Sequence, residues 1–224
     1  MGNNVDKIWS RIILPALGQT AYMTVLSIVI SVSIAFVLAI VLVYTGNDGL
    51  KPNKAVYGIL DVIINILRSV PFIILAVSII PLTRLILKTS IGETAAVIPL
   101  SVASAPFIAR LFENSFKKVD PSIIEAAKSF GASDMQIMFG VIIKEAVPSL
   151  VMDITLASIT ILGLTAMAGA VGAGGLGAVG LTYGYQSFND TIMFTTVILL
   201  VLLTAIIQMI GQIIYEEERF KSVK

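Results

Sequence analysis

The sequence has no cysteine and no histidine among its 224 residues, and only 13% of those residues are charged. Such a chain can form no disulfide, thiolate nucleophile, imidazole acid–base group or ordinary zinc site. Its formal net charge of +1 gives no basic surface for nucleic acid. It also lacks the G-x-x-x-x-G-K-[ST] loop that cradles nucleotide phosphates. We therefore expect no metal, no cofactor, no nucleic-acid partner and no catalytic centre in this chain.

What the sequence does contain is apolar residues, which make up 57% of the chain and give a mean hydropathy of +0.96. The remaining polar residues could not cover a soluble core of that composition, so membrane lipid is the expected solvent. A helix needs about 20 apolar residues to cross a bilayer core. Five segments meet that length: 20–44, 57–82, 93–113, 147–168 and 190–214. These predict an all-α integral membrane protein, a single transmembrane domain of residues 1–224.

Lysine and arginine in the connecting segments predict the orientation, because cytoplasmic loops carry an excess of them. With the N-terminus outside, ten of these residues fall inside: Lys51, Lys54, Arg110, Lys117, Lys118, Lys128, Lys144, Arg219, Lys221 and Lys224. Four fall outside: Lys7, Arg11, Arg84 and Lys88. The sequence therefore favours an outside N-terminus and a cytoplasmic C-terminus, as an odd number of spans requires.

The cytoplasmic segment 117–145, between the third and fourth predicted spans, has clear helix signals. Asp120 is a good N-cap, and Pro121 suits a first helical position. Gly131 can adopt the left-handed conformation that ends a helix. A short helix over 121–130 is predicted. Ser133 followed by Gln136 resembles a capping box that opens a second helix toward the fourth span.

One side of the predicted short helix carries Ile123, Ala126, Ala127 and Phe130 at helical spacing. The small alanines permit close approach of a partner, and Phe130 offers an apolar anchor. Two interpretations stay open on spacing alone. The helix could dock a partner protein, or it could rest on the lipid headgroups.

The order Glu125-Ala126-Ala127 with Gly131 four residues later resembles the E-A-A-x-x-x-G loop of permease subunits of bacterial binding-protein-dependent ABC importers. In that family the loop forms a coupling helix that sits in a cleft of an ATPase subunit. The resemblance implies that ATPase docking is carried by Glu125, Ala126, Ala127, Phe130 and Gly131.

Other segments are similar to the methionine-importer permeases of that family: 68–72, 80–84, 105–110, 166–172 and 183–186. The resemblance implies alternating-access import of methionine across a bacterial plasma membrane. It also implies a second copy of the chain, two separate ATPase subunits that hydrolyse the ATP, and an extracytoplasmic substrate-binding protein. Import of another amino acid or small solute is the alternative within the same class.

Polar and flexible side chains inside the spans are candidates for the transport pathway. Asp61, Asn65 and Arg68 share one helix face, because they stand at i, i+4 and i+7. They could line a pathway or couple an ion, which would favour a secondary transporter, or they could form a pair that fixes packing. The packing interpretation is favoured for Asp61. Met167 could plug a narrow pore, or it could be a filler among small residues.

Overall fold

The computed structural model describes residues 8–222, and those residues form helices joined by short connections. In chain order the helices are η1 Trp9–Ile13, α2 Leu14–Thr45, α3 Lys54–Ser69, α4 Phe72–Ser78, α5 Ile80–Leu87, α6 Glu93–Lys117, α7 Pro121–Ser129, α8 Asp134–Ile137, η2 Met138–Ile142, α9 Ile143–Gly169, α10 Gly175–Val179, η3 Gly180–Gln186 and α11 Asp190–Ser222. Lys7 and Lys224, which entered the orientation count, lie outside the described residues.

Within residues 8–222, four helical stretches are long and apolar enough to cross a membrane: Trp9–Thr45, Glu93–Lys117, Asp134–Gly169 and Asp190–Lys221. A fifth candidate is the pair α3 and α4, which pass the same test together but are bent by 105°. The prediction of an all-α protein with about five spans is confirmed. Sidedness stays a prediction.

The predicted second span, 57–82, is not one continuous helix. It is divided among α3, α4 and α5, with breaks at Val70–Pro71 and at Ile79. Pro71 has no N–H to continue the helical ladder, and its ring keeps Val70 out of the helical region. Its own ψ of 136° is extended. Apolar length alone suggested a single span here, and the proline is the physical reason that it breaks.

The described chain forms two compact units whose boundaries fall inside α2, α6, α9 and α11. The first unit comprises Met1–Ile30, Val70–Ser104 and Ser158–Gln208, and the second comprises Ser31–Ser69, Ala105–Ala157 and Met209–Lys224. In the first unit, a core is built from α2, α4, α6, α9 and the segment after α9. Its buried members are Met23, Phe72, Ala76, Ala96, Leu100, Ala168 and Ala173.

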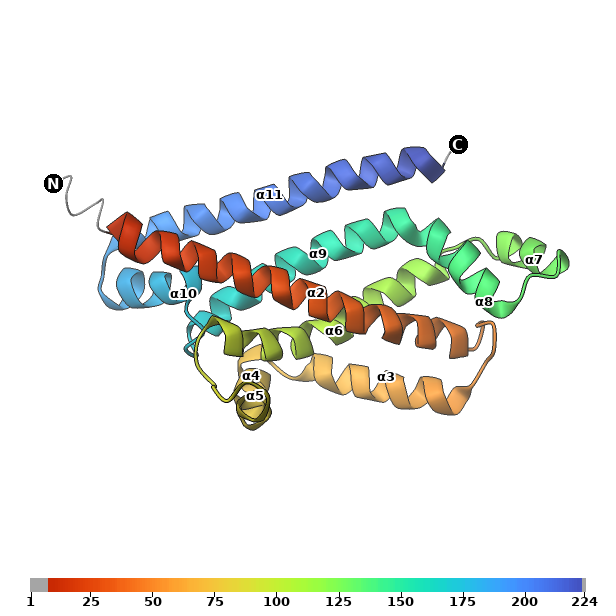
Figure 1. Cartoon of the computed structure of the whole chain (residues 1–224), viewed down its shortest axis with the longest axis horizontal. Helices are drawn as coiled ribbons and strands as arrows, with labels where there is room; N and C mark the ends of the chain where they lie inside the picture. The colour runs from red at the N-terminus through yellow and green to blue at the C-terminus, as the bar shows by residue number, and fades with distance from the viewer. Residues whose placement is uncertain (1–7, 223–224) are drawn as a thin grey trace. The chain divides into compact units, whose positions relative to one another are not determined.

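In the first unit, the short helix α10 is held against α2 by side-chain caps. The N–H of Gly175 donates to Oε1 of Gln19, and the N–H of Leu176 donates to Oγ1 of Thr20, both at 2.8 Å. Two donors that a helix start leaves unpaired are thereby satisfied. Gly177 packs so closely on α9 that an added Cβ would overlap the backbone of Ala166. Figure 1 shows α10 beside the start of the chain's first helix, which it contacts.

In the second unit, aromatic packing joins α2 to α6. The ring of Phe36 meets Phe112 and Phe116 edge-on, with centroids 6.3 and 6.2 Å apart. Ile64 of α3 is also buried in this unit. The connection after α6 contains α7 and α8, which contact each other, and α7 also contacts η2 (Figure 1).

Candidate functional site

Helix α7 forms as its sequence predicts. Asp120 is the N-cap, and its Oδ1 accepts the N–H of Ser122 at 2.8 Å. Pro121 occupies the first position, and Gly131 follows the helix with a φ of 80°, in the left-handed region. The predicted helix over 121–130 is confirmed, with its last residue at Ser129.

The second predicted capping signal is also confirmed. Ser133 accepts the N–H of Gln136 with its hydroxyl, and the backbone N–H of Ser133 donates to Gln136 Oε1 at 2.8 Å. This capping box opens α8 at Asp134. The Tyr44 hydroxyl then donates to Oδ2 of Asp134 at 3.3 Å, which ties the connection to the end of α2. This hydrogen bond holds the start of α8, and therefore the turn that follows α7, against α2 within the second unit.

Helix α7 has no buried residue, and an aromatic side chain is exposed at its C-cap. Phe130 is 91% exposed, and Glu125 and Ala126 are exposed beside it, whereas Ala127 is half-buried. Leaving a phenylalanine in water forfeits roughly 2 kcal/mol of burial free energy. The segment therefore presents an anchor that its own fold does not use.

A hollow of about 490 Å³ lies against α7 in the second unit. It is bounded by the loop of residues 46–50 after α2, by Tyr57 of α3 and by Lys117 of α6. Ile124, Glu125 and Lys128 line it from α7. An acidic and a basic side chain of α7 thus border this open space.

The Asp120 cap gives a testable pH dependence. Its hydrogen bonds to Ser122 lower the pKa of the Asp120 carboxyl below its usual value. Since the folded pKa is depressed, the stabilisation is present above the usual pKa and is lost as the pH falls through the folded value.

We expect Asp120→Ala to increase proteolytic cleavage of 117–145 in inverted vesicles at pH 7, with Asp120→Asn near wild type. Equal cleavage of all three proteins would contradict a role for the cap.

A buried polar cluster in the second unit was not predicted from the sequence. The Glu113 side chain is only 2% exposed and accepts Arg110 Nη1 and Lys117 Nζ, each at 2.6 Å. The hydroxyl of Tyr57 on α3 donates to the same carboxylate at 3.0 Å. Arg110 also forms an ion pair with Asp61 of α3. The spacing of Arg110, Glu113 and Lys117 at i, i+3 and i+7 was the available signal.

The three polar residues of α3 have different environments. Asp61 is paired with Arg110 on α6, which bears out the packing interpretation for that residue. Asn65 is exposed, and its side-chain amide donates to Asp61 at 3.1 Å. Arg68 is exposed, and its side chain has no ion-pair or hydrogen-bond partner within residues 8–222. Arg68 and Asn65 stay predictions as pathway residues.

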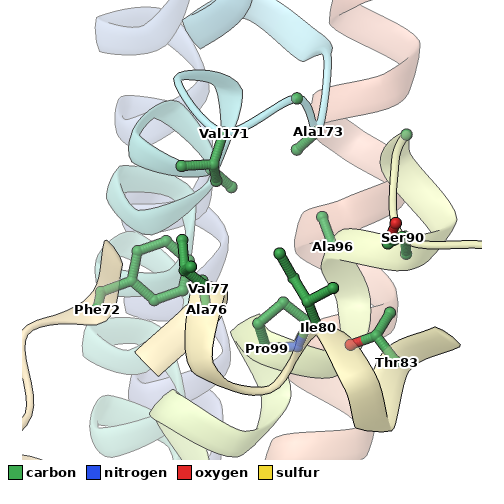
Figure 2. Close-up of a pocket in the computed structure, with 14 residues that line it drawn as sticks. Phe72, Ala76, Val77, Ile80, Thr83, Ser90, Ala96, Pro99, Val171 and Ala173 are labelled. Atoms are coloured by element: carbon green, nitrogen blue, oxygen red, sulfur yellow. The ribbon is translucent and has the colours of Figure 1, made fainter. Parts of the chain in front are cut away.

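The first unit holds a small apolar pocket of about 40 Å³ between α4, α5, α6 and the end of α9. Figure 2 shows Phe72, Val77, Ile80 and Val171 around it, with the hydroxyl-bearing Thr83 and Ser90 to one side. Its volume is far below the ~300 Å³ of an ordinary ligand pocket. Met167, on α9 in the same unit, is 42% exposed and is not among the lining residues. Its role as a gate is not tested by this geometry.

Residues 43–216, which include the polar cluster and α7, match the family of binding-protein-dependent transport system inner membrane components. The chain belongs to this family. It is accordingly a multi-pass inner-membrane protein. The sequence motif that pointed to the family comprises residues 125–131. It begins in the exposed helix α7 and ends at Gly131, just after that helix.

Among similar members of this family is the probable D-methionine transport system permease protein MetI of Vibrio cholerae. It is 40% identical over 202 residues, which cover 90% of each chain. The methionine import system permease protein MetP of Bacillus subtilis is 39% identical over 76% of this chain and 77% of its own. The fold is similar to that of one chain in a crystal structure of the MetNI methionine ABC transporter, the native crystal form with inward-facing conformations. That chain has a TM-score of 0.90 and 42% identity, with 92% of this chain and 96% of that chain covered.

Proposed function

We propose that this chain is the transmembrane permease of an ATP-driven importer that moves methionine across the plasma membrane by alternating access. The observation that carries the proposal is α7, a capped helix with the Glu125-Ala126-Ala127…Gly131 pattern and an exposed Phe130 at its end. A family of transport-system membrane components and relatives named for methionine transport support it.

ATP hydrolysis belongs to separate ATPase subunits, since this chain has no phosphate-binding loop. Two ATPase subunits dock on two copies of α7, with Phe130 as the apolar anchor and Glu125 and Lys128 as charged contacts. A rigid, capped helix suits this task because it can pass a displacement to the helices on either side without bending. Closure of the ATPase pair upon ATP binding then switches the pathway between inward-open and outward-open states.

Two copies of the chain are proposed to pair around a two-fold axis, because about five spans are few to enclose a solute path. The exposed apolar faces leave room for such a contact: the side chains of α11 that are exposed include Val197, Val201 and Leu202. Met167, Arg68 and Asn65 are proposed to line or gate the shared path. An extracytoplasmic binding protein delivers the cargo to the outer mouth, around 166–188.

Reconstitution of the chain with its ATPase and binding protein in liposomes tests the function. We expect uptake of labelled L-methionine that needs ATP inside and binding protein outside. D-methionine and other amino acids, each presented at the same concentration, measure the selectivity. ATP-dependent uptake of a different solute in preference to methionine would move the chain to another cargo in the same class.

The ion-coupled alternative predicts a different result from the same liposomes. A secondary transporter would move its cargo without nucleotide when a proton or sodium gradient is imposed. Asp61→Asn would then abolish that flux. The Asp61–Arg110 ion pair argues against this alternative, because a carboxylate committed to an arginine is poorly suited to take up and release an ion.

A further inference from the structure

The charges of α3 and α6 in the second unit do not balance. Helix α3 and residues 105–117 of α6, the parts that belong to this unit, carry four cations and two carboxylates: Lys54, Arg68, Arg110 and Lys117, and Asp61 and Glu113. Lys54 is the first residue of α3, where water can solvate its ammonium group, and Lys117, the last residue of α6, is paired with Glu113 at 2.6 Å. The two cations within the helices are therefore Arg68 and Arg110.

Arg110 contacts both carboxylates, and it shares Glu113 with Lys117. It pairs with Glu113 at 2.6 Å and with Asp61 across the two helices. Asp61 is further occupied by the amide of Asn65 at 3.1 Å. Arg68 is left as the excess charge, with no acidic partner within residues 8–222.

The position of Arg68 makes this excess costly in lipid. It stands 14 residues after Lys54, the first residue of α3, which is about 21 Å along a helix axis. That distance reaches well into a hydrocarbon core of about 30 Å. A cation at such a depth faces water or an anionic partner rather than lipid.

The surroundings of Arg68 suit a carboxylate. A guanidinium offers two parallel N–H donors that match the two carboxylate oxygens. Asn65 lies one turn away on the same face, and its amide nitrogen has a second N–H beyond the one given to Asp61. The Ser69 hydroxyl is directed to the backbone carbonyl of Asn65 at 2.8 Å, so it does not compete.

We propose that Arg68, assisted by the Asn65 amide, binds the carboxylate of the amino acid in transit through the permease. This inference rests on the proposed function, since it assigns a contact to the cargo of that importer. The site has one cation in each copy and recognises the part that all amino acids share. It therefore stabilises passage of the charged end, and it leaves selection among side chains to other parts of the importer.

The test uses the complete importer in liposomes and measures two rates: uptake of labelled L-methionine and hydrolysis of ATP stimulated by the binding protein. For Arg68→Gln we expect ATP hydrolysis within about twofold of wild type and uptake per ATP lowered roughly tenfold, because a charge-assisted contact is lost. Arg68→Lys should recover part of the uptake. Lys54→Gln, which removes a cation from the start of the same helix, should change neither rate.

Three results would overturn the proposal. Unchanged uptake per ATP in Arg68→Gln would show that the guanidinium does not touch the cargo. Unchanged uptake with a loss of thermal stability only in lipid would assign Arg68 to a phospholipid phosphate. A parallel fall of ATP hydrolysis and uptake in both Arg68 variants would indicate a structural role. A wild-type importer that moves no methionine would instead refute the proposed function, so the two failures are distinguishable.

Discussion

Glu125→Arg is expected to abolish ATP-driven uptake while the chain remains folded and inserted. The side chain is exposed on α7 and lines the hollow, and no hydrogen bond or ion pair to it is found within residues 8–222. The fold therefore loses little when it is replaced. Reversing the charge of a residue that contacts a docked partner places like charges against each other. That repulsion costs several kcal/mol, which is enough to separate the two proteins.

The measurement is co-purification of the ATPase subunits with the tagged permease, followed by uptake in liposomes. We expect at least a hundredfold loss of uptake and a clear loss of bound ATPase. Glu217→Arg is the matched control, because Glu217 is also exposed and pairs only loosely with Lys221 at 3.1 Å. Normal ATPase binding and uptake in Glu125→Arg would remove α7 from the coupling assignment.

Glu113→Gln is expected to destabilise the second unit more than any exposed substitution. The carboxylate receives donors from Arg110, Lys117 and Tyr57 at 2.6, 2.6 and 3.0 Å. Glutamine keeps the volume but removes the charge, and its amide nitrogen would face two cations. Breaking a buried pair in this way costs about 3 kcal/mol.

Thermal denaturation of the purified chain in detergent measures this cost. A loss of that size should lower the apparent Tm by roughly 5–10 °C. Tyr57→Phe removes only one neutral donor from the same carboxylate, so its Tm should fall by a smaller amount, about a third of that. A Tm for Glu113→Gln within 2 °C of wild type would show that the cluster contributes little to stability.

The helices of the 117–145 connection could be predicted from the sequence because their determinants are local. Asp120, Pro121 and Gly131 fix the two ends of α7 by backbone hydrogen bonding and a positive φ, and both need only neighbours in the chain. The capping box of Ser133 and Gln136 is equally local. The spans were predictable for a similar reason, since apolar length is a property of one segment.

The features that the sequence did not predict depend on contacts between distant segments. Glu113 pairs with Tyr57, 56 positions earlier in the chain, and no pattern within α6 indicates that partner. The break of 57–82 at Pro71 is different, because its cause is local and apolar length alone does not show it. The docking roles of Glu125, Ala126, Ala127, Phe130 and Gly131 stay predictions.

The central claim is that α7 is a cytoplasmic helix covered by an ATPase subunit, and single-cysteine labelling tests it most directly. The chain has no native cysteine, so Ser129→Cys, at the exposed end of α7, would carry the one thiol. We expect a membrane-impermeant maleimide to label it in inverted vesicles stripped of the ATPase. Sealed right-side-out vesicles should give no labelling, and added ATPase should protect the thiol. Labelling from outside, or labelling that the ATPase does not reduce, would contradict the account.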